Sequence, residues 1–85
     1  MIKMMSVNDS EAKIINYLFE NKEKEAWGME ITRVLDMPKR TVYRNLESLE
    51  EKKIVEVERK GNMIFYTLAP KWVKVIELLK NDIFI

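Results

Sequence analysis

Apolar residues recur at helical spacing along the first part of the chain, which predicts one helix followed by a shorter one. The first helix begins at Asp9 or Ser10, either of which is a favourable N-cap, and ends near Asn21. Its apolar positions are Ala12, Ile14, Ile15, Leu18 and Phe19. After a short extended piece at 26–28, the second helix carries its apolar positions on one face, at Ile31, Val34 and Leu35.

A third helix follows almost immediately. Pro38 disfavours helical conformation in the residue before it but itself fits the first turn of a new helix, so residues 36–38 predict a tight break. The third helix runs from about Lys39 to Lys53. Its inward positions, spaced i, i+4 and i+7, are Val42, Leu46 and Leu49. Two helices joined by a short turn are therefore predicted before the middle of the chain.

Beyond Lys53 the apolar period changes from about 3.6 to 2. Residues 54–59 and 63–68 are β-rich runs, and the intervening Lys60-Gly61-Asn62 supplies residues that tolerate the positive φ of a hairpin turn. Pro70 closes the second strand, and a last helix runs from Lys71 to about Asp82. Its apolar stripe consists of Trp72, Val75, Ile76 and Leu79.

The chain length and composition limit the classes of function. With 85 residues, there is room for one domain: a flexible segment 1–8, a core 9–68 and a terminal helix 70–85. No cysteine or histidine is present, so thiolate chemistry, the usual general base and the commonest metal ligands are missing. We expect no enzyme activity, no metal, no cofactor and no small-molecule ligand. No apolar run is long enough to span a bilayer or act as a signal, so we expect a cytoplasmic protein without a membrane partner.

The charge is distributed unevenly. The net charge is only +1, but residues 1–36 carry 5 cations and 7 acids, a net of −2, whereas residues 37–85 carry 10 and 7, a net of +3. With the aliphatic positions of the third helix turned inward, Lys39, Arg40, Thr41, Tyr43 and Arg44 face outward within two turns, and no acid lies among them. The acids of this helix come only later. This polarity suits a helix that enters a DNA major groove N-terminus first.

The segment from Leu35 to Val55 resembles the winged helix-turn-helix family of transcription regulators, in which such a turn precedes a recognition helix whose Val/Leu/Leu face packs inward. The similarity extends over about residues 14–68, and the order of elements agrees. The resemblance implies a mainly α fold with a small β-hairpin (α+β): a three-helix core, a wing and an additional C-terminal helix. It also implies sequence-specific binding to double-stranded DNA by a regulator, which we expect to be a repressor.

The geometry of the third helix, together with this resemblance, suggests individual roles. Arg40, Thr41 and Arg44 are candidates for contacts with base edges. Lys39, Tyr43 and Asn45 are candidates for contacts with phosphates, which fix the register without reading the sequence. At the hairpin tip, the candidates for the minor groove or its phosphates are Arg59, Lys60 and Asn62.

The last helix carries more apolar area than so small a helix is expected to expose, since Leu78 and residues 83–85 add to its stripe. Similar regulators commonly dimerise through terminal helices and bind inverted repeats. We therefore expect a homodimer whose interface includes Trp72, Val75, Ile76, Leu79 and Ile83. A monomer with a folded-back tail is the alternative. We interpret Trp27 as a core or hairpin anchor in preference to the alternative, a ligand platform.

A second function stays open, because the winged-helix fold also serves as a protein-interaction module and a fold does not determine function. The modest net charge and the apolar C-terminus favour that alternative. RNA binding has less support, since no aromatic platform for single-stranded bases is evident.

Overall fold

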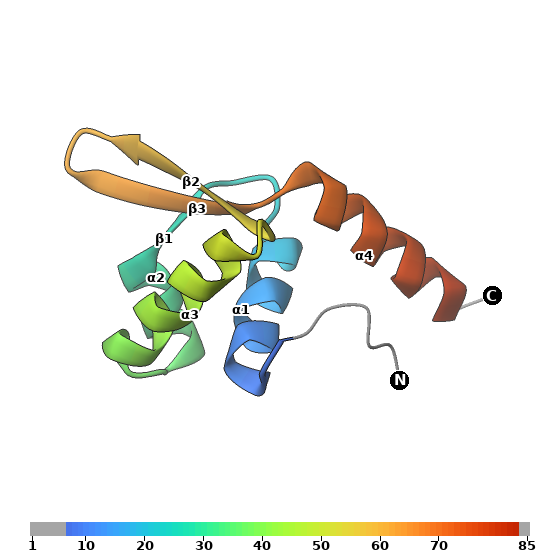
Figure 1. Cartoon of the computed structure of the whole chain (residues 1–85), viewed down its shortest axis with the longest axis horizontal. Coiled ribbons are helices and arrows are strands. Elements are labelled where there is room, and N and C mark those ends of the chain that lie inside the picture. The colour runs from blue at the N-terminus through green and yellow to red at the C-terminus, as the bar shows by residue number, and fades with distance from the viewer. Residues whose placement is uncertain (1–6, 84–85) are drawn as a thin grey trace.

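The computed structural model describes residues 7–83, and the side chains of residues 7–80. Within this part, four helices and three strands follow in the order α1 (Asp9–Glu20), β1 (Ala26–Trp27), α2 (Gly28–Leu35), α3 (Lys39–Glu51), β2 (Val55–Lys60), β3 (Met63–Leu68) and α4 (Pro70–Ile83) (Figure 1). The fold is the mainly helical winged helix expected from the sequence. Residues 1–6, most of the segment expected to be flexible, lie outside the described residues.

The sheet has three antiparallel strands in the order β1-β3-β2. The expected hairpin forms between β2 and β3, with Val57 opposite Tyr66, and Gly61 takes a φ of 61° in its turn. The short extended piece before α2 pairs with β3 as well, with Trp27 opposite Phe65. The sheet therefore ties the hairpin to the start of α2.

The core lies where the first three helices meet the sheet. The inward face predicted for α3 is confirmed, since Val42 and Leu49 are 0% exposed and Leu46 is 1% exposed. These residues join a buried cluster that also contains Ile14, Ile15, Leu18, Phe19, Ala26, Ile31, Ile54, Val55, Tyr66, Leu68 and Ile76. The recognition helix is thus held along its whole apolar ridge.

Two apolar positions expected to face inward are exposed. Ala12 lies on the outer side of α1, and Val34 is 56% exposed. In the short helix α2, packing follows the i, i+4 pair Ile31 and Leu35, which leaves Val34 at the edge of the buried face.

Three helix ends differ from the expected ones. The N-cap of α1 is Asn8, which accepts a hydrogen bond from the Glu11 amide at 2.7 Å. Helix α3 ends at Glu51, because Lys53 adopts a left-handed φ of 62° that turns the chain toward β2. Helix α4 begins at Pro70, because the fixed φ of proline suits the first helical position.

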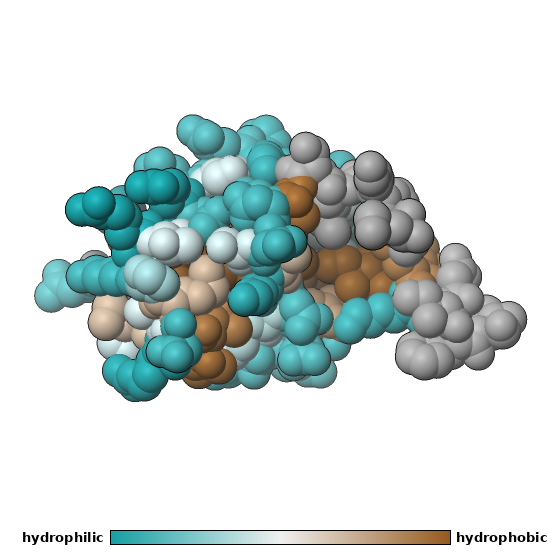
Figure 2. Space-filling view, turned by 90° about the horizontal axis from the view of Figure 1, so that it is seen from below, coloured by the Kyte–Doolittle hydropathy of each residue, from teal (hydrophilic) through white to brown (hydrophobic). Residues whose placement is uncertain are grey.

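Helix α4 projects from the end of the molecule opposite the hairpin tip and gives it an elongated shape of 43 × 23 × 23 Å (Figure 1). Apolar surface is visible where α4 meets the rest of the molecule (Figure 2). None of the helices described is long and apolar enough to cross a membrane.

Candidate nucleic-acid interface

Helix α3 presents its cations on the face opposite its buried ridge. Lys39, Arg40 and Arg44 are exposed, and Thr41 is half-buried beside them. Among the described residues, Arg40 and Arg44 have no hydrogen-bond or ion-pair partner. Two guanidinium groups on successive turns are therefore free to bind an anionic ligand or the acceptor edge of a guanine.

The beginning of α3 adds a further positive feature. Its N-cap is Pro38, whose side chain makes no capping hydrogen bond, and its first turn contains no acidic residue. The amides of that turn and the positive end of the helix dipole are thus not satisfied by a side chain of α3 itself. Both favour an anion such as a phosphate.

Tyr43 lies where α3 meets the start of α2. A Cβ atom at Gly28 would overlap the hydroxyl and ring of Tyr43, so the glycine gives the ring room to lie in this position. The Lys39 ammonium lies 5.9 Å from the centroid of the Tyr43 ring, within the range of a cation–π contact. Tyr43 and Lys39 are consequently neighbours on the outer side of the helix.

Asn45 does not have the phosphate-facing place expected from the sequence. It is 7% exposed, its amide Nδ2 donates to the Thr41 carbonyl at 2.7 Å, and its Oδ1 accepts from Asn8 Nδ2 at 3.2 Å. The spacing of Asn45 from Val42 and Leu49 already places it on the inward face. The structure thus makes Asn45 a link between α3 and α1.

A second link behind α3 was not anticipated. Glu11 is 1% exposed, accepts from the Asn8 amide at 2.9 Å, and has both carboxylate oxygens 3.1 Å from Lys52 Nζ. The sequence offered a signal for this role, because Glu11 stands three residues after Asn8, as in a capping box, and three residues before Ile14. The N-terminus of α1 is thereby held to the C-terminal end of α3.

The pKa of Glu11 reflects two opposing effects. Burial raises the pKa, but the hydrogen bonds from the Asn8 backbone, the Ser48 side chain and Lys52 lower it by more. The pKa therefore lies below its ordinary value. Glu11 is ionised when the domain is folded at neutral pH.

The hairpin tip presents Arg59, Lys60 and Asn62 on the surface, as expected. Lys60, however, already has partners: its Nζ lies 2.7 Å from Glu25 Oε1 and 3.9 Å from Glu58 Oε1.

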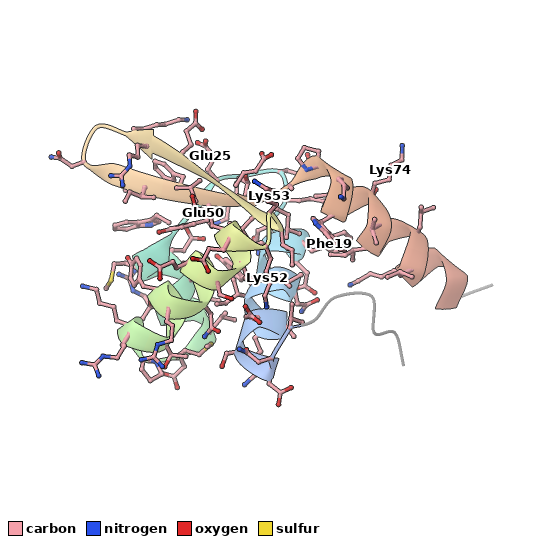
Figure 3. The ribbon with its side chains drawn as sticks, viewed as in Figure 1. Phe19, Glu25, Glu50, Lys52, Lys53 and Lys74 are labelled. Atoms are coloured by element: carbon pink, nitrogen blue, oxygen red, sulfur yellow. The ribbon has the colours of Figure 1, made fainter. Side chains whose placement is uncertain are left out.

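Figure 3 shows Glu25 beside the hairpin, on the connection between α1 and β1. The hydrogen bond from Lys60 lowers the pKa of Glu25, whereas the hydrogen bond with Glu25 raises the pKa of Glu58. Arg59 and Asn62 have no such side-chain partner among the residues described. The charge of Lys60 is thus neutralised by neighbouring acids.

The residues expected at a dimer interface divide into two groups. Ile76 is 8% exposed and belongs to the core of its own chain, and Trp72 packs against that core. Val75 and Leu79 are half-buried, and the neighbouring Leu78 is 58% exposed. The side chain of Ile83 lies outside the described residues.

A contact between the second half of α4 and α1 helps to position this helix. The Phe19 ring has the Lys80 ammonium 4.7 Å and the Lys22 ammonium 4.6 Å from its centroid. Both distances suit cation–π attraction.

A helix-turn-helix followed by a β-hairpin that pairs with a third short strand defines a winged helix-turn-helix domain. Residues 3–72 match the model of the family described as sugar-specific transcriptional regulator TrmB, and the chain belongs to this family. The family is one of regulators and not of enzymes. No curated protein matches the chain.

Solved structures of other proteins share the fold at low sequence identity. MepR, a transcription regulator of the Staphylococcus aureus multidrug efflux pump MepA, is 18% identical with a TM-score of 0.78, over 89% of this chain and 57% of that one. MepR has also been solved in complex with DNA. AF1382 from Archaeoglobus fulgidus is 20% identical with a TM-score of 0.75, over 92% of this chain and 88% of that one.

A further similar structure is the homodimeric winged helix-turn-helix DNA-binding domain of Mb0332 from Mycobacterium bovis. It is 24% identical with a TM-score of 0.72, over 89% of this chain and 68% of that one. The present chain therefore spans little more than half of MepR but most of the smaller proteins.

Proposed function

We propose that this protein is a homodimeric regulator that binds specific double-stranded DNA and represses transcription by occupying its site. The observation that carries the proposal is the pair of unpartnered, exposed guanidinium groups of Arg40 and Arg44 on the first two turns of α3, where no acid opposes them. Helix α3 enters the major groove, and Arg40, Thr41 and Arg44 contact base edges.

The phosphate contacts come from both sides of this helix. Lys39 and Tyr43 bind the backbone together with the uncapped first turn of α3. Arg59, Lys60 and Asn62 of the hairpin bind near the adjacent minor groove. Asn45 is left out of this set, because it is buried and hydrogen-bonded within the domain.

The dimer forms through α4, with Val75, Leu79 and Ile83 of the predicted interface joined by Leu78. Trp72 and Ile76 support this surface from the core side. The exposure of Leu78 supports this arrangement, as does the homodimeric state of the Mycobacterium domain with the same fold. Two copies related by a two-fold axis present two copies of α3 to half-sites about one helical turn, roughly 34 Å, apart.

The experiment is a selection of bound duplexes from random DNA, followed by fluorescence anisotropy on the selected duplex at several salt concentrations. We expect a palindromic motif and an affinity that falls steeply as salt rises. A lack of duplex binding at low salt contradicts the proposal.

The dimer is tested by sedimentation of Leu78→Glu beside Val34→Glu, which places the same charge on an exposed apolar position of α2. We expect Leu78→Glu to dissociate the dimer and Val34→Glu to leave it intact. Equal sedimentation of both variants and the unaltered protein contradicts an α4 interface.

The exposed apolar side of α4, with the neutralised Lys60, favours one alternative, a protein-interaction module without DNA binding. In that case Leu78→Glu abolishes partner capture, whereas charge reversal at Arg40 and Arg44 has no effect.

A further inference from the structure

A small hollow lies between α3 and the hairpin, next to the cationic face. Its volume is about 200 Å³, and its lining includes Trp27, Gly28, Tyr43, Asn62 and Met63. One wall thus comes from α3, another from the hairpin, and a third from the junction of β1 with α2.

Most of the side chains that line the hollow are apolar or aromatic. Trp27 is 37% exposed and Met63 is 38% exposed, and neither belongs to the core cluster. The backbone of Trp27 anchors the edge of the hairpin, as the sequence suggested, but its side chain is not part of the core. Its indole N–H has no acceptor among the residues that the structure describes. Both side chains are therefore accessible to a ligand that enters the hollow.

The size of the hollow restricts its occupant. A volume of about 200 Å³ equals that of six or seven water molecules and is smaller than the pockets of roughly 300–1,000 Å³ that hold drug-sized ligands. It suits a single small ring. Its rim is positive on the side of α3, because Lys39 lies against the Tyr43 ring.

The location of the hollow supplies the remaining constraint. When one element enters the major groove and the hairpin reaches the adjacent minor groove, the DNA strand between the two grooves crosses the space between those elements. The strand presents a deoxyribose with an apolar face, flanked by phosphates. That chemistry matches apolar walls with a cationic rim.

We propose that Trp27, Tyr43 and Met63 form a seat for one deoxyribose of the bound DNA, with Trp27 packing against the sugar. The inference rests on the proposed DNA-binding function and adds a contact that carries no charge. Such a contact fixes the register of α3 in the groove without reading a base.

The first test compares Trp27→Ala with Val34→Ala, which truncates an exposed apolar side chain that does not line the hollow. Anisotropy on the selected duplex is measured as a function of salt. We expect Trp27→Ala to weaken binding about fivefold or more, as truncation of a buried interface aromatic does. Because no charge is removed, the slope of log affinity against log salt stays the same. Trp27→Phe recovers part of the loss.

The second test detects the contact between Trp27 and DNA directly. In Trp72→Phe, Trp27 is the only tryptophan of the chain, and its emission and its quenching by acrylamide are followed as the labelled duplex is added. We expect the emission to change and the quenching to decrease at the same DNA concentration at which anisotropy rises. The quenching measurement separates a contact with DNA from a merely structural role.

Three outcomes overturn the seat. One is a saturating anisotropy change with unaltered Trp27 emission and quenching, which leaves DNA binding itself intact. Another is an affinity of Trp27→Ala equal to that of the unaltered protein. The third is an absence of any anisotropy change, which removes the proposed function as well.

Discussion

The first turns of α3 and the tip of the hairpin carry similar residues but differ in how ready they are to bind DNA. Arg40 and Arg44 are exposed and unpartnered within the described chain, whereas Lys60 is paired with Glu25 and lies near Glu58. Behind α3, moreover, Asn45 and Glu11 fix the helix to α1. A count of cations therefore does not measure a DNA-binding surface, because local acids decide which cations are available.

The largest effect is expected on α3. Arg40→Ala or Arg44→Ala should each weaken binding to the selected duplex by about 1–3 kcal/mol, roughly 5- to 150-fold, and relax sequence preference at the contacted position. Lys13→Ala, which removes an exposed cation from α1, is the control and should have little effect. Anisotropy on the matched duplex measures the affinity of each variant, and the comparison with mismatched duplexes measures its sequence preference. Equal losses for the three variants would show that only total charge matters.

The support behind α3 should appear in stability. Glu11→Ala removes a buried carboxylate that accepts from the Asn8 amide and from Lys52, so the free energy of unfolding should fall by about 1–3 kcal/mol. Glu20→Ala changes an exposed acid of the same helix and should stay within about 0.5 kcal/mol of the unaltered protein. Urea unfolding followed by circular dichroism measures both. Similar losses would contradict a special role for Glu11.

The same carboxylate should make stability depend on pH. Because the pKa of Glu11 is lower in the folded chain than in the unfolded chain, its contribution is complete above the ordinary glutamate pKa, about 4.3, and is lost as pH falls through the lower folded value. The difference in unfolding free energy between the unaltered protein and Glu11→Gln should therefore shrink below pH 4.3. A difference that does not vary with pH would refute this.

The smallest effect is expected at the hairpin. Glu25→Gln should release Lys60 and strengthen DNA binding about two- to fivefold at low salt, with a salt dependence steeper by almost one unit. Stability should hardly change. Glu23→Gln removes the same charge from the same connection without touching Lys60, and should have a smaller effect. Identical results for the two variants would mean that Lys60 does not exchange Glu25 for a phosphate.

The sequence predicted the fold because the elements that define it are periodic. The ridge of Val42, Leu46 and Leu49 and the change to period 2 after Lys53 depend only on neighbours along the chain. Even the exposure of Arg40 and Arg44 follows from that ridge.

The features of the site that the sequence did not predict depend on contacts between residues that are far apart in the sequence. Asn45 meets Asn8 across 37 positions, and Lys60 meets Glu25 across 35. Local spacing placed Asn45 on the inward face of α3 and contradicted its assignment to phosphate, but nothing in that spacing specifies Asn8 as its partner. In the same way, nothing near Lys60 in the sequence specifies Glu25, so a lysine at a turn looked available. The hollow beside Trp27 was missed for the same reason, since residues of β1, α2, α3 and β3 form it together.

The close approach of Tyr43 to Gly28 affects which substitutions this sequence can accept during evolution. Any side chain acquired at position 28 would meet the ring of Tyr43, so the ring must move aside or become smaller when that glycine is replaced. Among relatives of this chain, a larger residue at the start of the second helix should therefore often coincide with a smaller one at the fifth position of the third.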